Sequence, residues 1–280
     1  MNLRELDIPE PLQKVDMDTV IRIADEAGRK ILEVYSREDL FVEYKDDKSP
    51  LTMADRLSHE HISSELKRLY PDIPIISEEQ KDIPWEDRKD WDYFWLVDPL
   101  DGTKEFIKRN GEFTVNIALI LDKKPFLGVI YVPVKNEFYY AVRGEGAYKI
   151  DKNGNREKIP QKRTLPEGEI KVVASRSHKS KEVEEYVEQL KKIFPEVDYV
   201  SSGSSLKLCL VGEGKAHIYP RLGPTMEWDT GAGQIIAEEA GGVVEDYETK
   251  KEMEYNKKIL RNNFFIVYDS PELKQRLSEI

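Results

Sequence analysis

Cysteine and long apolar runs are scarce in this sequence. A single cysteine, Cys209, occurs among the 280 residues, so no internal disulfide can form and the fold does not depend on an oxidising compartment. No segment approaches the roughly 20 apolar residues that span a bilayer. The first eighteen residues, MNLRELDIPEPLQKVDMD, contain no apolar stretch of signal-peptide length. We therefore expect a cytoplasmic protein without a transmembrane segment.

Basic residues are also in deficit. The chain has 43 Lys+Arg against 54 Asp+Glu, which gives a formal net charge of −11. Binding of polymeric nucleic acid requires lysines and arginines that neutralise phosphates, so this class of partner is disfavoured. Hydrophobic residues make up 39% and charged residues 35%, which argues against disorder. The negative charge conflicts with binding of an anionic substrate unless cations offset it.

The first half of the chain is predicted to contain helices followed by a sheet. Apolar residues recur at helical spacing over 17–35, and a second helix is expected over 52–70. Short apolar runs at 73–76 and 93–97 both end in acidic residues. Successive strands with turns between them are predicted at 113–121, 125–132 and 137–142.

The polar stretch 149–169 is the predicted junction between two lobes. After it, strands expected at 170–174, 197–200, 216–219 and 260–268 alternate with helices at 180–194, 204–213, 230–240 and 271–280. This alternation is typical of an α/β arrangement. We predict an N-terminal α+β lobe over residues 1–155 and a C-terminal α/β lobe over residues 156–280.

The segment LVDPLDGTKEF, residues 96–106, carries the strongest chemical signal. Asp98 and Asp101 end an apolar run, and carboxylates at this spacing can bridge two hard cations with a backbone carbonyl between them as a further ligand. Gly102 and Thr103 follow at an expected helix start, where free backbone N–H groups attract a phosphate. The alternative is an ordinary turn, because Asp, Pro and Gly all favour turns.

Four further acidic residues, at three places in the chain, stand at the ends of predicted elements. Glu78 and Glu79 follow the apolar run 73–76, with a solvated loop as the alternative. Asp55 has capping-box spacing from Thr52 and can simply cap a helix. Asp229 begins a helix of small residues, where an ordinary N-cap is the alternative. Because active-site groups are commonly mounted at such ends, their number favours a shared site.

Three motifs in this order, Ser77–Glu79, Asp98–Thr103 and Trp228–Asp229, resemble the lithium-sensitive, magnesium-dependent phosphatase superfamily of inositol monophosphatase. The second half resembles its 3′(2′),5′-bisphosphate nucleotidase branch more closely than its inositol branch. That likeness lies in VASRSH (173–178), GSSLKLCLVGEGKAHIYPRLGPTMEWDT (203–230) and EAGG (239–242). The resemblance covers the chain from about Asp16 to the last strand, and implies a layered αβαβα sugar-phosphatase fold and a role in sulfur assimilation.

The resemblance also implies roles for individual residues. Glu78 matches a ligand of the first metal, Asp98 the ligand that bridges two Mg²⁺ ions, Leu100 a backbone-carbonyl ligand, and Asp101 and Asp229 ligands of the second metal. A third, weakly held Mg²⁺ would lie near Glu78 and Asp55. Thr103, Asp55 and Glu78 match the catalytic residues, of which the first two orient and deprotonate the attacking water. Gly102 and Thr103 match backbone groups that hold the scissile phosphate, close to Glu78, Leu100, Asp101 and Asp229.

The substrate prediction depends on the 203–229 segment. Gly203, Ser204 and Ser205 stand where the family contacts the ring or sugar of the substrate. Arg221 replaces a glutamate of the inositol branch, and a guanidinium suits a second phosphate better than a hydroxyl. The alternative is a structural or surface arginine.

The resulting hypothesis is a phosphatase that removes the 3′-phosphate of adenosine 3′,5′-bisphosphate, or of its sulfated form, by metal-activated water. An inositol or fructose bisphosphate phosphatase and a catalytically silent nucleotide sensor are the alternatives, and relatives suggest a homodimer. Five acids in one cleft (Asp55, Glu78, Asp98, Asp101 and Asp229) would concentrate divalent cations and reverse the local electrostatics. An acidic protein can then bind an anionic ester. Cys209, in the apolar run LKLCLV, is predicted to be an inert core thiol.

Overall fold

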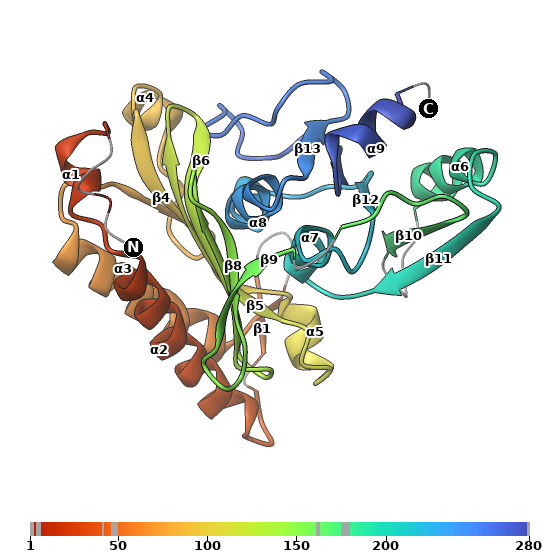
Figure 1. Ribbon diagram of the computed structural model, residues 1–280. Helices are drawn as coiled ribbons and strands as arrows, with labels where there is room; N and C mark the ends of the chain where they lie inside the picture. The colour runs from red at the N-terminus through yellow and green to blue at the C-terminus, as the bar shows by residue number, and fades with distance from the viewer. Residues whose placement is uncertain are drawn as a thin grey trace.

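The computed structural model describes residues 3, 7–40, 42–45, 50–160, 163–174 and 180–278. Five layers alternate between helices and sheets across the molecule (Figure 1). Helices α2 and α3 cover one face of a seven-stranded sheet, and α7 and α8 separate this sheet from a five-stranded one. Helices α6 and α9 cover the outer face of the second sheet. The αβαβα layering expected from the resemblance is confirmed.

The N-terminal helices form where the apolar periodicity predicts them. After the short α1 (Glu10–Gln13), α2 spans Met17–Tyr35 and buries its apolar face. Its start is capped by Asp16, which accepts a hydrogen bond from the backbone N–H of Thr19 (2.9 Å). Helix α3 (Met53–Leu69) packs beside α2. Among the described helices, none is both long and apolar enough to cross a membrane.

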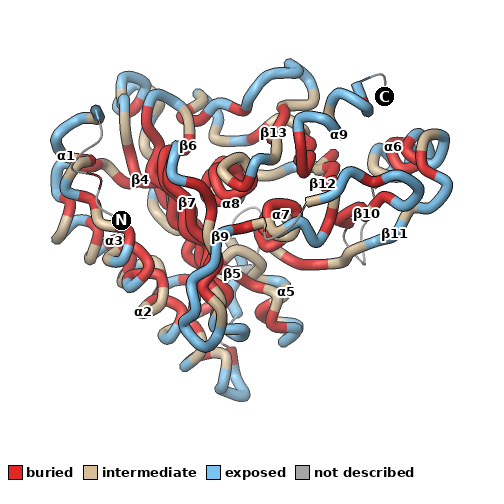
Figure 2. The backbone as a smooth tube through the Cα atoms, in the orientation of Figure 1, coloured by how far each residue is buried: buried red, intermediate tan, exposed pale blue. Residues whose placement is uncertain are grey.

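The larger sheet has the strand order β3-β4-β5-β6-β7-β8-β9. Only β3 and β4 pair in parallel, and the other neighbours are antiparallel. Figure 2 shows its central strands almost wholly buried. The strands are β3 (Ile75–Ser77), β4 (Tyr93–Asp101), β5 (Thr114–Leu121), β6 (Lys124–Val132), β7 (Glu137–Val142), β8 (Gly146–Ile150) and β9 (Arg156–Ile159). The hairpin β1 (Glu43–Tyr44) and β2 (Pro50–Leu51) and the short helices α4 (Trp85–Arg88) and α5 (Thr103–Ile107) complete this half.

The smaller sheet has the strand order β11-β10-β12-β14-β13 and is mixed. Its centre pairs β10 in parallel with β11 and β12, whereas β14 runs antiparallel to β12 and β13. The elements are β10 (Glu169–Ala174), α6 (Lys181–Leu190), β11 (Glu196–Ser201), α7 (Leu206–Gly212), β12 (Ile218–Arg221), α8 (Glu227–Glu239), β13 (Val243–Asp246), β14 (Phe265–Tyr268) and α9 (Pro271–Arg276).

Helix α8 lies unusually close to the larger sheet because small residues face each other. A Cβ atom at Gly128, on β6, would stand 2.7 Å from the carbonyl oxygen of Ala232 on α8. No side chain fits at that separation, so glycine is required there. The close packing brings the first turn of α8 beside the end of β4.

The predicted junction at 149–169 is partly wrong. Strand β8 extends to Ile150, and β9 adds a further edge strand to the seven-stranded sheet. The first three residues of β9 are exposed, so an edge strand has the polar composition of a loop. The division of the chain at 155/156 stays a prediction.

Smaller differences occur in the second half. The strand expected over 260–268 begins only at Phe265, and β13 was missed because it has only four residues. Residues 175–178 of the VASRSH motif lie outside the described residues.

Candidate metal-binding and catalytic site

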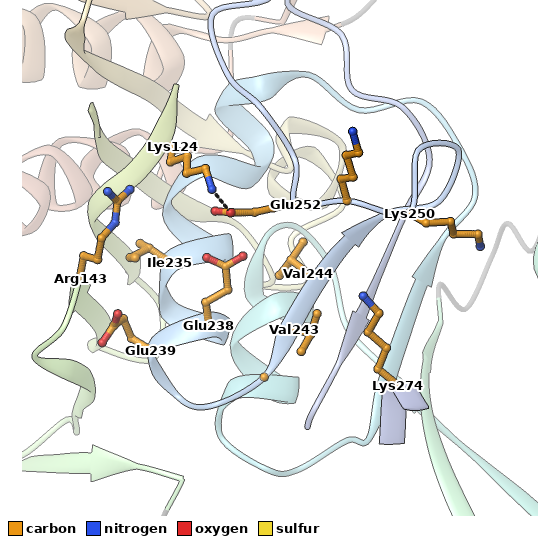
Figure 3. A pocket seen from close by; sticks show the side chains of 12 residues that line it. Lys124, Arg143, Ile235, Glu238, Glu239, Val243, Val244, Lys250, Glu252 and Lys274 are labelled. Atoms are coloured by element: carbon orange, nitrogen blue, oxygen red, sulfur yellow. Dashed lines mark hydrogen bonds and ion pairs between the residues drawn. The ribbon is translucent and has the colours of Figure 1, made fainter. Parts of the chain in front are cut away.

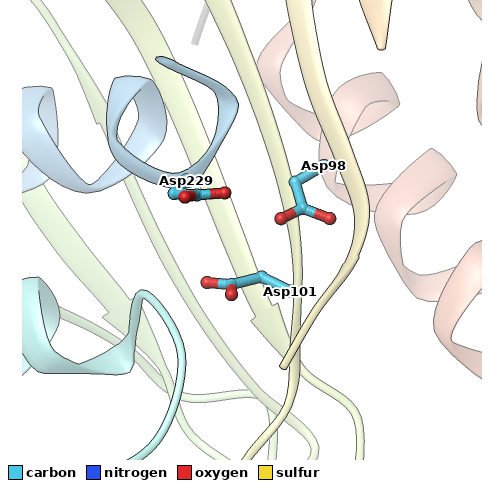
Figure 4. A group of neighbouring side chains, drawn as sticks. All are labelled: Asp98, Asp101 and Asp229. Carbon is cyan, nitrogen blue, oxygen red and sulfur yellow. The ribbon is translucent and has the colours of Figure 1, made fainter. Parts of the chain in front are cut away.

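Three aspartates converge between the larger sheet and α8 (Figure 4). Asp98 and Asp101 lie at the end of β4, and Asp229 lies in the first turn of α8. One carboxylate oxygen from each lies within 4.8 Å of the others. Residues three apart in a regular strand point to opposite faces. The pairing of β4 with β5 shifts register between Asp98 and Asp101. This irregularity allows the two carboxylates to lie in one group with that of Asp229.

Asp229 is held by the helix that carries it. Its Oδ2 accepts a hydrogen bond from the backbone N–H of Met226 (2.8 Å). Asp229 is therefore not the N-cap that the sequence allowed, since Met226 holds that position, but as the third helical residue it bonds back to the N-cap backbone. Its other oxygen is available to a ligand. Capping and metal binding are compatible at this residue.

Burial and neighbouring carboxylates raise the pKa of all three aspartates. Burial, followed by repulsion from Glu78, Asp101 and Asp229, holds the pKa of Asp98 well above its ordinary value, and Asp98 is only 1% exposed. Burial also raises the pKa of Asp101. Burial and then the charge of Asp101 raise the pKa of Asp229 to about 8. Three carboxylates that repel one another when ionised offer only oxygen ligands. Such a group suits a hard divalent cation such as Mg²⁺.

Asp55 joins a helix start to the predicted phosphate-binding turn. Its Oδ2 accepts hydrogen bonds from the backbone N–H and the hydroxyl of Thr52 (2.7 and 2.5 Å), which completes the predicted capping box. Its Oδ1 accepts a hydrogen bond from the Thr103 hydroxyl (3.0 Å). One oxygen therefore caps α3 and the other contacts Thr103, whereas the catalytic role of Asp55 stays a prediction.

The turn before α5 has the backbone shape that its sequence predicts. Gly102 adopts a left-handed conformation, with φ of 93°, immediately before Thr103 begins the helix. The Thr103 hydroxyl also lies 3.4 Å from the Leu100 carbonyl oxygen. Leu100, Gly102 and Thr103 thus lie beside Asp98 and Asp101, as their order in the chain predicts.

Glu78 lies beside the three aspartates without belonging to their tight cluster. Its charge contributes to the raised pKa of both Asp98 and Asp55. Its carboxylate accepts a hydrogen bond from Lys45 (2.8 Å), and Lys45 also contacts Glu79 (2.6 Å). The sequence analysis missed Lys45, because only the fold brings it to acids 33 and 34 residues away.

A buried polar network connects the metal site to the 203–205 segment. The backbone N–H of Ser205 donates to Oδ2 of Asp101 (2.6 Å), and the Asn116 amide lies 3.4 Å from the same oxygen. The Ser205 hydroxyl donates to the Asn116 side-chain oxygen (2.8 Å) and also contacts Thr114 (2.8 Å). Sequence reasoning missed Thr114 and Asn116, although polar residues inside the apolar strand 113–121 could have indicated them.

Asp101, Ser205 and Asp229 are among the residues that line a cavity of about 300 Å³. Two cationic side chains, Lys207 and Arg221, share its wall with Asp101 and Asp229. Lys207 was not predicted, and its charge lowers the otherwise raised pKa of Asp101. The remaining lining includes Gly102, Glu105, Ser204, Ser205, Tyr219, Thr225 and Phe265.

Two buried atoms facing this region have no hydrogen-bond partner among the described residues, Nε of Arg221 and Oγ of Ser204. Another Arg221 nitrogen donates to the Pro224 carbonyl oxygen (3.0 Å), which holds the side chain in place. Buried polar groups are normally satisfied. Unpaired donors on a cavity wall therefore fit a ligand rather than a purely structural arginine.

A larger cavity of about 580 Å³ lies at the other end of α8 (Figure 3). None of the predicted site residues lines it. Lys124 pairs with Glu252, and Glu239 accepts hydrogen bonds from the backbone N–H groups of Gly144 and Gly146 (both 2.8 Å). The smaller cavity is the better candidate for catalysis, because Asp101 and Asp229 line it and neither lines the larger one.

Comparison with known proteins places these features in context. The model of the inositol monophosphatase family matches residues 10–279. The 3′(2′),5′-bisphosphate nucleotidase CysQ of Escherichia coli K12 is 50% identical over 236 residues, which is 84% of this chain and 92% of that protein. The Haemophilus influenzae protein of the same name is 33% identical over 90% of this chain and 93% of its own length.

Solved structures agree. CysQ from Bacteroides thetaiotaomicron superimposes with a TM-score of 0.81 at 46% identity, covering 90% of this chain and 96% of that one. An inositol monophosphatase from Thermotoga maritima superimposes with a TM-score of 0.71 at 26% identity, covering 94% and 95%.

Proposed function

Because the chain belongs to the inositol monophosphatase family, we propose that it is a magnesium-dependent phosphatase. Its substrate in this proposal is adenosine 3′,5′-bisphosphate, from which it removes the 3′-phosphate. The observation that carries the proposal is one cavity shared by metal-binding aspartates and two cations, Lys207 and Arg221. The 50% identical relative from E. coli K12 is named as a nucleotidase of this specificity.

The metal would be held by Asp98, Asp101 and Asp229, with Glu78 and the Leu100 carbonyl beside them. Mg²⁺ bound there supplies screening of phosphate charge and lowers the pKa of coordinated water. Two ions, with a third held weakly, are the number that we propose. Magnesium thus offsets the acidic charge that would otherwise repel the substrate.

The protein's own groups perform the remaining tasks. Asp55 accepts a hydrogen bond from the Thr103 hydroxyl. In this proposal the pair orients the attacking water and accepts the proton that the water loses. Glu78, at the end of β3, is the third catalytic acid in the proposal. The backbone N–H groups of Gly102 and Thr103 hold the scissile phosphate at the start of α5.

The second phosphate is assigned to the cationic wall. Arg221 has an unpaired buried Nε, and Lys207 stands on the same cavity. A guanidinium and an ammonium recognise phosphate through charge-assisted hydrogen bonds. Ser204 and Ser205 line the same cavity, and together with the preceding Gly203 they are assigned to the sugar.

Phosphate release tests the assignment. Arg221→Met and Lys207→Met should each raise KM for adenosine 3′,5′-bisphosphate by roughly tenfold or more, since a hydrogen bond to a charged group contributes about 1.5–3 kcal/mol. Neither should raise KM for inositol 1-phosphate, which lacks a second phosphate. Lys192→Met, an exposed residue in the turn after α6, is the matched control. Unchanged KM values in both variants would refute the assignment of the second phosphate.

Parallel assays separate the alternatives left by the sequence. Faster phosphate release from inositol 1-phosphate or fructose 1,6-bisphosphate than from adenosine 3′,5′-bisphosphate would show that the proposed substrate is wrong. Asp98→Asn should abolish magnesium-dependent turnover, whereas a nucleotide sensor would show no turnover in the parent. Calorimetry should find weaker bisphosphate binding without Mg²⁺, and equal affinities would contradict the electrostatic argument. Assembly as a homodimer and a cytoplasmic location stay predictions.

A further inference from the structure

The first turn of α8 is held by a segment that is distant in sequence. Residues 254–262, here called the collar, belong to the long connection between β13 and β14 and contain no helix or strand. The backbone N–H of Glu227 donates to the Leu260 carbonyl oxygen (2.9 Å), and that of Asn262 donates to the Thr225 carbonyl oxygen (2.9 Å). The collar is therefore bonded directly to the turn that carries Asp229.

The Glu227 side chain bonds α8 to the collar. Its side chain is 0% exposed, yet it is a carboxylate. One oxygen accepts the backbone N–H of Asn256 (2.7 Å), and the other accepts the backbone N–H of Lys257 (3.0 Å) and the Lys257 ammonium (2.7 Å). Every donor comes from the collar. A buried carboxylate with this many donors is stable only in one geometry.

The cation opposite Glu227 is equally well satisfied. Besides Glu227, the Lys257 ammonium donates to the carbonyl oxygen of Glu254 (2.7 Å) and lies 3.3 Å from the side-chain oxygen of Asn262. The Asn262 amide in turn donates to the Met226 carbonyl oxygen (2.8 Å) and to the Thr230 hydroxyl (2.9 Å). These contacts bracket Asp229 on both sides along the helix.

The collar is also fastened to the other half of the metal site. Arg88, which is 3% exposed, lies on α4, shortly before β4 begins at Tyr93. Its guanidinium donates to the Asn256 side chain (2.7 Å) and to the carbonyl oxygens of Lys257 (2.8 Å) and Lys258 (3.1 Å). The Asn256 amide returns a bond to the Arg88 carbonyl oxygen (2.7 Å). The collar thus bridges the chain that leads into β4 and the turn that presents Asp229.

We propose that Glu227 is a positioning residue, which fixes Asp229 relative to Asp98 and Asp101 through the collar and so sets the affinity for Mg²⁺. The proposal rests on the proposed metal site. Glu227 is two residues from Asp229, and its carboxylate bonds to the collar. Residues that orient metal ligands typically change metal affinity or activity by about 10–100-fold when they are replaced. A constellation split between a strand and a helix needs such a constraint, because neither element alone fixes the distance.

The test is calorimetric titration of the metal-free protein with Mg²⁺. Glu227→Gln keeps the shape of the side chain but places an NH₂ group against N–H donors. We expect Mg²⁺ binding to weaken at least tenfold, with the magnesium concentration for half-maximal activity rising by the same factor and kcat recovering at saturating Mg²⁺. Glu254→Gln makes the same change on an exposed side chain of the collar and should leave both quantities unchanged.

If Glu227 only stabilises the fold, the measurements should differ. Glu227→Gln would then lower the melting temperature or the folded fraction without shifting the Mg²⁺ titration of the folded protein, and this result would overturn the proposal. If Glu227→Gln does not fold, Lys257→Gln carries the same prediction, because the Lys257 side chain is 33% exposed. Unchanged Mg²⁺ affinity in that variant would also overturn it.

Asp229→Asn separates this proposal from the proposed function. If Asp229→Asn weakens Mg²⁺ binding and Glu227→Gln does not, only the positioning role fails. If Asp229→Asn leaves Mg²⁺ binding intact, the metal site itself is misassigned and both proposals fail.

Discussion

Asp229 should reduce the stability of the metal-free protein at neutral pH. Burial and the neighbouring Asp101 raise its pKa from 3.8 to about 8. Because the pKa of Asp229 is higher in the folded protein than in the unfolded chain, this group contributes its full stability at pH values below the unfolded-state pKa. That contribution is lost as the pH rises to the folded-state pKa of about 8. The difference of about 4 pKa units gives an upper limit of about 6 kcal/mol at about 1.36 kcal/mol per unit.

The expected effect is smaller than this limit. Asp229 is only partly shielded from water, and solvent and side-chain movement screen repulsion between such groups, so we expect about 2–3 kcal/mol. Asp229→Asn removes the charge, and its side-chain oxygen can still accept the hydrogen bond from the Met226 backbone. At roughly 2 °C per kcal/mol for a chain of this size, its melting temperature in EDTA at pH 8 should lie about 4–6 °C above the parent's.

Thermal unfolding followed by fluorescence across pH 4–9 measures this difference. The gap should be small near pH 4, grow as the pH rises and level off above pH 8. Mg²⁺ should raise the melting temperature of the parent more than that of the variant. Asp90→Asn, an exposed change in the turn before β4, should not raise the melting temperature at pH 8. A variant that is no more stable than the parent at pH 8 would refute the reasoning.

Three further outcomes follow from the structure. Because the pKa values of Asp98, Asp101 and Asp229 are raised, Mg²⁺ binding at pH 7 should release protons; calorimetric heats that do not depend on the buffer's protonation enthalpy would contradict this. Gly203→Ala places a Cβ atom 2.7 Å from the Glu112 carbonyl oxygen. Because the substitution would displace the 203–205 segment, it should lower kcat/KM by roughly tenfold or more. Gly168→Ala, which has open space around it, should leave kcat/KM unchanged. Cys209 is 0% exposed with a pKa raised by burial, so a thiol reagent should label it only after denaturation, and labelling of the native protein would show that the α7 core opens.

Local sequence patterns predicted the helices and the central strands well. Helix α2 has the predicted bounds, 17–35, because its apolar residues repeat at helical spacing and Asp16 caps it within three residues. The strands with buried, apolar sequences were also found, within one residue at β5 and β6. These elements depend on interactions between near neighbours, which the order of residues records directly.

The errors share one cause. Strand β9 is polar because it lies at a sheet edge, and its pairing with β8 makes it a strand. Lys45 and Lys207 have no local motif that marks them, yet one contacts Glu78 and Glu79 and the other lines the cavity with Asp101. Position in the sheet or the cavity, rather than neighbouring sequence, determines the role of each.

The sequence by itself determined which side chains are the candidates for chemistry, because DPLDGT and the acids at element ends are local patterns with local geometric consequences. It also placed Thr52 and Asp55 in a capping box that the structure contains. The tertiary structure alone decided how these parts meet. The convergence of Asp98, Asp101 and Asp229, the raised pKa of about 8 at Asp229 and the bonds from the collar to Glu227 all arise between residues far apart in the chain. Burial and electrostatic repulsion depend on distance in space, and that distance is set by tertiary contacts such as the packing of α8 against β4.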